Sequence, residues 1–214
     1  MTDATLSFTH RYVPGAEPNG PILLLLHGTG GDEDDLLGLG KLLLPDAGLL
    51  SPRGKVLENG APRFFRRLAA GVFDEKDLIA RTAELAAFVR EAAVAYEFDA
   101  SRVIAAGFSN GANIAAAMLL LHPDVLRGAV LFRAMVPLQP PSMPDLTAVT
   151  VYLSAGRFDT MIPPANTEQL ATMLREAGAD VTLAWVPQGH NLTPDEVDAA
   201  RRWLASHPSL VGGG

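Results

Sequence analysis

The residues best suited to carry chemistry lie in segment 107–111, which reads Gly-Phe-Ser-Asn-Gly and matches the pattern G-x-S-x-G. A serine in this pattern sits on a sharp strand-to-helix turn, and the flanking glycines remove Cβ atoms that would collide with neighbouring elements. Residues 102–106 have the apolar character of a strand, and residues 112–121 are rich in Ala and Leu, as in a helix. We therefore predict that Ser109 is a nucleophile; the alternative is a strand–helix turn without chemistry.

A serine hydroxyl needs a base to take its proton, and the chain has five histidines. His190 is the best candidate, because it follows the last predicted strand, and loops in that position lie over the carboxyl edge of a parallel sheet. Its alternative is a solvated loop histidine. The remaining histidines are predicted to be surface, capping or turn residues, namely His10, His122, His207 and His27.

The base in turn needs an acid that holds its tautomer and stabilises the imidazolium. Asp159 lies just past a predicted strand that ends near Ser154, which places it at the same sheet edge. Its alternative is an Asx-type turn residue. The chain order Ser109, Asp159, His190 is the order found in α/β-hydrolases.

Acyl transfer also requires donors for the developing oxyanion. The backbone N–H groups of Asn110 and Thr29 are our candidates, the second in the glycine-rich turn after an early strand. We expect His27 to order this turn by hydrogen bonding without transferring a proton. The turn begins like a dinucleotide fingerprint, but Glu33 replaces its third glycine, and the acidic residues at 32–35 would repel a pyrophosphate.

Strands must alternate with helices to bring these residues together. Short apolar runs predict strands, and Ala- or Leu-rich stretches predict helices. The predicted strands cover residues 22–26, 48–50, 102–106, 128–132, 148–154 and 181–186, and the predicted helices cover 34–44, 78–96, 112–121, 164–177 and 193–206. Residues 51–67 are expected to form a long polar loop. This alternation predicts a mostly parallel sheet with helices on both faces, in a single domain over residues 1–210 with a disordered tail at 211–214.

Composition excludes several classes of protein. The absence of cysteine removes disulfides, thiolate metal sites and a cysteine nucleophile. A net charge of −7 argues against nucleic-acid binding. No apolar run approaches the ~20 residues of a membrane helix, and residues 1–20 lack an apolar signal core, so we expect a cytoplasmic protein. Without H-E-x-x-H and with scattered histidines, no metal site is expected.

Four blocks, at residues 27–33, 107–113, 156–163 and 189–190, occur in the order typical of one family. On them the chain resembles the phospholipase/carboxylesterase branch of the α/β-hydrolases, which includes acyl-protein thioesterases and small bacterial carboxylesterases. The resemblance implies an α/β-hydrolase fold without a large cap domain. It also implies Ser109, Asp159 and His190 as the triad, with Thr29 and Asn110 as oxyanion donors and no cofactor.

The chain departs from the thioesterase members, which usually read G-F-S-Q-G-G and H-G-L-G-D. Asn110 replaces the glutamine, Ala112 the second glycine and Thr29 the leucine. The oxyanion donors are backbone groups, so these changes bear on substrate choice. Segments 51–54 and 63–67 are similar to those of bacterial carboxylesterases, which favours small esters over protein thioesters.

The expected activity is hydrolysis of short-chain or aromatic carboxylic esters through an acyl-enzyme on Ser109. The alternatives are an acyl thioesterase or lysophospholipase with the same triad, and a binding module that has lost catalysis. Aromatic and thioether side chains suit a small apolar pocket, and the candidate walls are Phe64, Phe65, Met135, Phe158 and Met161. Arg63, Arg66 and Arg67 could meet an anionic substrate or form a solvated basic cluster. Leucine-rich surface stretches are compatible with a homodimer.

Overall fold

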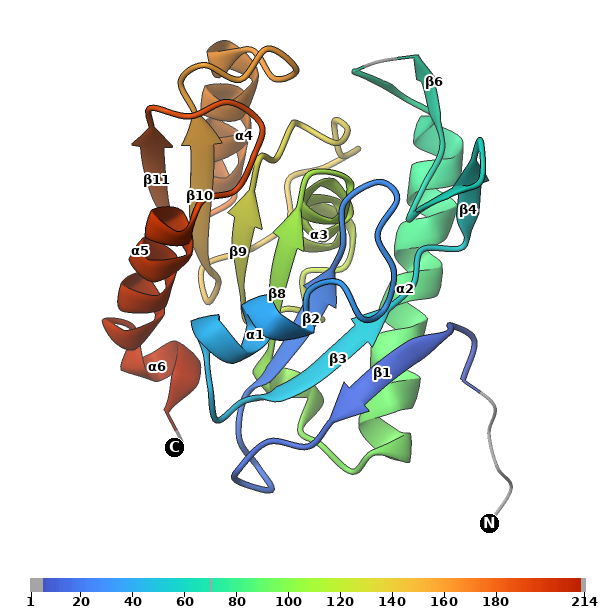
Figure 1. Cartoon of the computed structure of the whole chain (residues 1–214), viewed down its shortest axis with the longest axis vertical. Coiled ribbons are helices and arrows are strands. Elements are labelled where there is room, and N and C mark those ends of the chain that lie inside the picture. The colour runs from blue at the N-terminus through green and yellow to red at the C-terminus, as the bar shows by residue number, and fades with distance from the viewer. Residues whose placement is uncertain (1–5, 70, 213–214) are drawn as a thin grey trace.

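The structure, a computed structural model, describes residues 6–69 and 71–212 and is built around a seven-stranded sheet in the order β1-β3-β2-β8-β9-β10-β11 (Figure 1). Only the edge strand β1 is antiparallel to its neighbour; the other adjacent strands are parallel. The strands are β1 (His10–Val13), β2 (Ile22–Leu26), β3 (Gly48–Pro52), β8 (Val103–Phe108), β9 (Gly128–Phe132), β10 (Thr150–Gly156) and β11 (Asp180–Val186).

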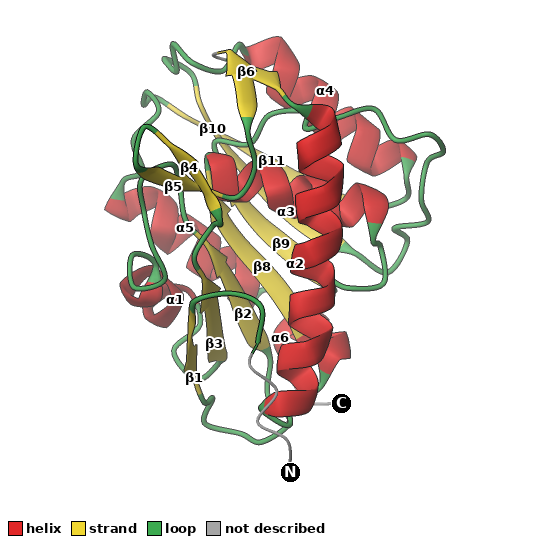
Figure 2. Ribbon diagram, turned by 90° about the vertical axis from the view of Figure 1, so that its right-hand side faces the viewer, coloured by secondary structure: helices red, strands yellow, loops and turns green. Residues whose placement is uncertain are grey.

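Helices cover both faces of this sheet (Figures 1 and 2). They are α1 (Leu37–Leu43), α2 (Glu75–Ala95), α3 (Asn110–Leu121), α4 (Pro164–Glu176), α5 (Pro194–Ala205) and α6 (Pro208–Val211), with a short 3₁₀ turn at Ala100–Arg102. None of the helices in the described part of the chain is long and apolar enough to cross a membrane.

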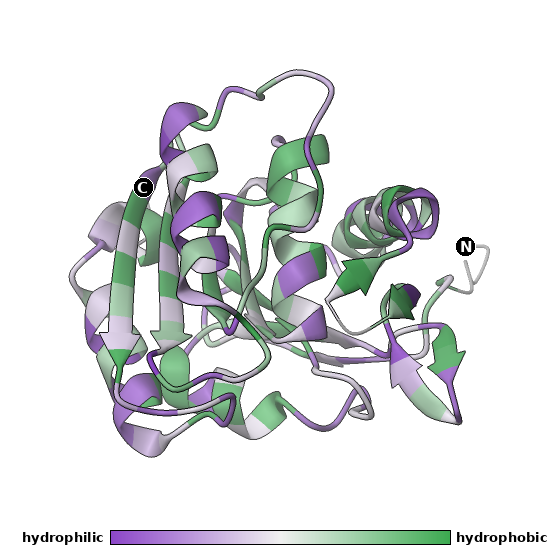
Figure 3. Ribbon diagram, turned by 90° about the horizontal axis from the view of Figure 1, so that it is seen from above, coloured by the Kyte–Doolittle hydropathy of each residue, from purple (hydrophilic) through white to green (hydrophobic). Residues whose placement is uncertain are grey.

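Strand β2 shows why the sheet needs helices on both sides. Leu24 and Leu26 pack into the cluster with α2, α3 and α4, whereas Leu23 and Leu25 pack into the cluster with α1, α5 and α6. Alternate side chains of a strand point to opposite faces, so an unbroken apolar run must be covered twice. The banding of the helices in hydrophilic and hydrophobic colours in Figure 3 fits this arrangement.

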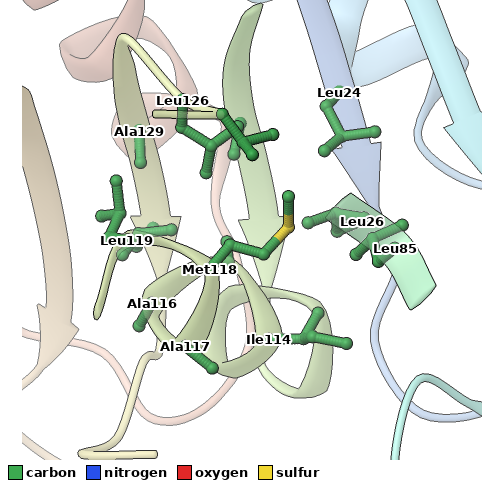
Figure 4. Packing of buried hydrophobic residues seen from close by; sticks show 14 of the residues in the cluster. Leu24, Leu26, Leu85, Ile114, Ala116, Ala117, Met118, Leu119, Leu126 and Ala129 are labelled. Carbon is green, nitrogen blue, oxygen red and sulfur yellow. The ribbon is translucent and has the colours of Figure 1, made fainter. Parts of the chain in front are cut away.

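Helix α3 lies at the centre of the larger cluster and carries the predicted nucleophile at its start. Ile114 and Met118 of α3 meet Leu24 and Leu26 of β2 and Leu85 of α2 (Figure 4). Every residue of α3 from 110 to 120 is buried. Because a helix that is apolar on all sides must be enclosed by protein, α3 is a rigid support for the turn that precedes it.

Local signals in the sequence fix several helix ends. The pattern Thr193-Pro-Asp-Glu196 forms a capping box at the start of α5, with Thr193 and Glu196 bonding reciprocally. Gly178 follows α4 with φ +96°, the left-handed conformation that glycine favours just past the end of a helix. In α2, the side chain of Asp74 accepts a hydrogen bond from Asp77 N at 3.1 Å.

Several sequence-based boundaries need correction. Helix α2 begins at Glu75 rather than 78, and β10 covers Thr150–Gly156 rather than 148–154. The expected loop at 51–67 includes the hairpin of β4 (Val56–Glu58) and β5 (Ala61–Arg63), and a second ladder joins β6 (Arg67–Ala69) to β7 (Val72–Phe73). Helix α1 begins three residues later than predicted, at Leu37 rather than 34. In the expected tail, Val211 closes α6, Gly212 O accepts a hydrogen bond from Arg102, and 213–214 lie outside the described residues.

Candidate active site

Ser109 lies on the turn between β8 and α3 and has a left-handed backbone, with φ 51° and ψ −111°. A non-glycine residue in this region is strained and persists only where the surroundings impose it. Close packing does so here: a Cβ on Gly111 would lie 1.9 Å from Leu26 O, and one on Gly107 would lie 2.8 Å from Ala112 N. Both glycines of the pattern are therefore required for the approach of α3 to β2 and β8.

Among the three predicted triad residues, His190 lies within hydrogen-bond distance of both Ser109 and Asp159. His190 Nε2 is 2.9 Å from Ser109 Oγ, and His190 Nδ1 is 2.8 Å from Asp159 Oδ2. With Nδ1–H donating to the carboxylate, Nε2 is left to accept the serine proton. This geometry is that of a nucleophile, a base and an orienting acid.

Asp159 makes the contacts required both of an Asx-type turn residue and of an acid that holds His190. Its Oδ1 accepts hydrogen bonds from Met161 N at 2.8 Å and Ile162 N at 3.2 Å, as in an Asx-type turn. Its Oδ2 faces His190, and the carboxylate is only 2% exposed. The turn therefore fixes the direction of the carboxylate that holds the imidazole.

Arg133 supports the loop that carries His190. It follows β9, has φ 59°, and its side chain is fully buried. Its guanidinium donates to Gly189 O at 2.8 Å and to Asn191 O at 2.7 Å, the carbonyls on either side of His190. It also pairs with Glu196 at 2.6 and 3.0 Å. Although burial raises the pKa of Glu196, hydrogen bonds from Arg133 and Ser154 bring it below its usual value.

The sequence analysis did not predict the supporting role of Arg133 or its ion pair with Glu196. The sequence pattern at residues 193–196 accounts for the capping role of Glu196 but not for its pair with Arg133. A signal for Arg133 was present, because it directly follows a predicted strand at the functional edge of the sheet. Its partner, however, lies 63 residues away along the chain.

Thr29 and Asn110 both line the cavity that contains Ser109 and His190. As the first residue of α3, Asn110 has a backbone N–H without a partner inside the helix. Its side-chain Oδ1 accepts a hydrogen bond from Phe64 N at 2.8 Å, which ties the turn to the β4–β5 region. The hydroxyl of Thr29 accepts one from Arg63 at 2.6 Å.

The candidate pocket residues divide into two groups. Met135 and Met161 line the cavity, which has a volume of about 260 Å³. The expectation for the three phenylalanines is corrected: Phe64 and Phe65 lie in the core, 2% and 0% exposed, and Phe158 points to solvent at 69% exposed. Phe64 packs at a tilt against His27, and Phe65 packs edge-on against Phe73, which lines the cavity.

Other parts of the surface are less suited to chemistry. A larger hollow of about 820 Å³ lies beside Arg102 and Arg127, but no triad residue lines it. The hydrogen-bonded pair Ser109 and His190 lines the smaller cavity, which is therefore the candidate active site. Within residues 6–69 and 71–212, no cluster of three or more His, Asp or Glu side chains could hold a metal ion.

His27 is buried behind the glycine-rich turn. Its Nε2 accepts a hydrogen bond from Gly54 N at 3.0 Å, so Nδ1 carries the proton and donates to Gly28 O at 2.6 Å. Burial lowers the pKa of His27. The side chain thus connects the turn to the chain before β4 as a neutral group, as the sequence suggested.

This lowered pKa predicts how stability depends on pH. The unfolded chain takes up a proton at His27 below about pH 6.5, whereas the folded protein keeps it neutral to a lower pH. The contribution of His27 to stability is therefore complete above that pH and is lost as the pH falls below it. Between about pH 7.5 and pH 5, urea unfolding should show a larger fall in the free energy of unfolding for the wild type than for His27→Gln. Equal falls in the two proteins would contradict this.

The mostly parallel sheet, with Ser109 on a strained strand-to-helix turn and Asp159 and His190 after later strands, defines an α/β-hydrolase fold without a large cap. The Phospholipase/Carboxylesterase family matches residues 10–208, and the chain belongs to this family of hydrolases. This confirms the resemblance read from the sequence motifs.

Known relatives agree with this assignment. The protein MhqD of Bacillus subtilis (strain 168) is 50% identical over 194 residues, which cover 91% of this chain and 96% of MhqD. The crystal structure of the Bacillus cereus carboxylesterase has 46% identity and a TM-score of 0.93 over 94% of this chain and 95% of that one. A carboxylesterase structure from Mesorhizobium loti has 33% identity and a TM-score of 0.88 over 96% and 97%.

Proposed function

We propose that this protein is a serine carboxylesterase that hydrolyses small esters through an acyl-enzyme on Ser109. The observation that carries the proposal is the continuous hydrogen-bonded path from Ser109 through His190 to Asp159 at the wall of a cavity. The carboxylesterase names of the solved relatives point to the same reaction class.

In the proposed reaction, Ser109 Oγ attacks the ester carbonyl carbon while His190 Nε2 takes the hydroxyl proton. The backbone N–H groups of Thr29 and Asn110 donate to the oxyanion that forms. Collapse of this intermediate breaks the ester C–O bond, and His190 gives its proton to the departing alcohol. Water, deprotonated by His190, then attacks the acyl carbon. The bond from that carbon to Ser109 Oγ breaks, the acid leaves, and His190 returns the proton to Oγ. Asp159 orients the imidazole throughout.

The size of the cavity favours short acyl or aryl groups. Its volume of about 260 Å³ lies below the range of about 300–1,000 Å³ usual for drug-sized ligands. Met135 and Met161 supply an apolar but adaptable wall. A long acyl chain, as in a lysophospholipid or a lipidated protein, would extend beyond this space.

A series of p-nitrophenyl esters from acetate to palmitate tests the substrate size. We expect acetate and butyrate esters to give values of kcat/KM at least about 100-fold above the palmitate ester, because the extra methylenes find no enclosed surface. Release of p-nitrophenol against an enzyme-free blank measures each rate. A maximum at long chains would instead support a thioesterase or lysophospholipase. No turnover of this series or of the charged esters described below would contradict the esterase proposal.

A further inference from the structure

Two arginines, Arg63 and Arg67, line the cavity that contains Ser109 and His190. Glu58 is the only carboxylate paired with either in the described structure, 2.9 Å from Arg67 Nε and 3.2 Å from Arg63 Nε. Two guanidinium groups therefore share one carboxylate, although the chain as a whole has a net charge of −7. The cavity wall carries an excess of positive charge.

The side chain of Arg63 is held rigidly, and its positive charge is poorly compensated. Its side chain is 4% exposed, donates from Nη1 to Thr29 Oγ1 at 2.6 Å and from Nε to Phe65 O at 3.2 Å, and has Nη2 left to donate to a ligand. Burial, with the neighbouring Arg67, lowers its pKa. Glu58 Oε2 is buried without a hydrogen-bond partner among the described residues, so its pairing with Arg63 lacks good geometry. A buried cation in this condition is stabilised by an added anion.

The two arginines differ in accessibility, and Arg66 between them differs from both. The side chain of Arg67 is 31% exposed, so it can move to meet a ligand. Arg66 is 62% exposed, does not line the cavity, and pairs with Asp74 and Asp77. The basic segment is thus not a uniformly solvated cluster: Arg63 and Arg67 face the reaction space, and Arg66 faces away from it.

The positive charge of Arg63 and Arg67 lies in the same cavity as Ser109 and His190. Arg63 bonds the side chain of Thr29, whose backbone N–H we propose as an oxyanion donor. In a cavity of about 260 Å³, a group bound at the arginines is separated from the scissile carbonyl by only a few bonds. The charged group must therefore belong to the same small molecule that is hydrolysed.

We propose that the substrate is a small ester bearing a carboxylate on its acyl or alcohol half, which Arg67 and Arg63 bind. This inference rests on the esterase function proposed above. It adds a charged recognition group to a pocket that the apolar side chains alone would suit to neutral esters.

Two matched pairs of esters test the inference and show which half of the substrate carries the carboxylate. Methyl hydrogen succinate and its neutral analogue methyl 4-oxopentanoate differ in charge on the acyl half. 4-Acetoxybenzoate and its neutral analogue 4-acetylphenyl acetate differ in charge on the alcohol half. Hydrolysis is followed by acid release at constant pH. We expect kcat/KM for the charged member of one pair to exceed that of its neutral analogue by about tenfold.

Three variants separate the contribution of Arg67 from that of Arg66. Arg67→Gln should bring the ratio of the preferred pair close to one, chiefly by raising KM for the charged ester, while hydrolysis of the neutral ester continues. Arg67→Lys should keep part of the preference, because a charge remains without the planar fork. Arg66→Gln is the matched control and should leave the ratio unchanged.

The outcomes distinguish this inference from the function on which it rests. If neither pair shows a preference for the charged ester, or if Arg67→Gln retains that preference, the anion-binding inference is wrong while the esterase function stands. If wild-type protein hydrolyses none of the four esters or the p-nitrophenyl series, the esterase function itself is wrong.

Discussion

Replacement of Ser109 by alanine is expected to lower kcat for ester hydrolysis by about 10⁶-fold, the cost seen when the serine of a triad is removed. His190 lies 2.9 Å from Ser109 Oγ, and no other hydroxyl is hydrogen-bonded to that imidazole within residues 6–69 and 71–212. Without Oγ, neither the acyl-enzyme nor its proton transfer can form. The residual rate reports only what the oxyanion donors and binding supply.

The control for this prediction is stability. Ser109→Ala keeps the backbone of the turn and removes one partly buried hydrogen bond, so the free energy of unfolding should change by no more than about 1 kcal/mol. Ser101→Ala, in the exposed 3₁₀ turn that precedes β8, should retain full activity. A fluorophosphonate probe should label the wild type and Ser101→Ala but not Ser109→Ala. Substantial hydrolysis by a folded Ser109→Ala protein would show that another residue is the nucleophile.

Replacement of Arg133 by methionine is expected to lower the free energy of unfolding by about 3–5 kcal/mol, the typical cost of removing one member of a buried ion pair. Both side chains of the Arg133–Glu196 pair are essentially inaccessible to solvent, at 0% and 1% exposed. The loss leaves the Glu196 carboxylate buried without its cation and frees the carbonyls of Gly189 and Asn191. Because these carbonyls flank His190, kcat should fall as well.

Arg127 provides the matched control, since it lies at the other end of β9. Its guanidinium donates to Ser209 O at 2.8 Å on the exposed surface. Arg127→Met should therefore change the free energy of unfolding by only about 0.5 kcal/mol and leave kcat unaltered. Urea unfolding and ester hydrolysis measure the two effects. Equal losses of stability in Arg127→Met and Arg133→Met would show that the buried ion pair contributes no more to the free energy of unfolding than a surface contact.

The sequence predicted the sheet, and the position of the triad candidates, because both follow from local signals. Residues at the carboxyl ends of parallel strands converge on one edge, and Ser109, Asp159 and His190 each follow such a strand. The hairpin of β4 and β5 also had a local signal: Asn59 and Gly60 form the turn with φ 52° and 85°. An Asn-Gly pair is a strong hairpin indicator, so a hairpin could have been predicted within residues 51–67.

Other features depend on contacts between distant segments and could not be predicted in this way. Phe64 and Phe65 resemble pocket residues in composition, but they are buried behind His27 and Phe73. Arg133 is an ordinary loop residue until Glu196 is placed against it. Arg63 and Arg67 become distinct from Arg66 only when the strands around them set which side chains face the cavity. Burial and pairing of this kind are properties of the assembled fold.

The hairpins from β4 to β7 lie outside the seven-stranded sheet. They carry Arg63 and Arg67, whereas the proposed triad stands on loops that follow β8, β10 and β11. This separation makes the molecule modular. Mutational drift or engineered exchange within the hairpins can reshape and recharge one wall of the cavity, while the strand ends that align the nucleophile keep their packing. New ester preferences are thereby open to selection at little risk to the folding of the central domain.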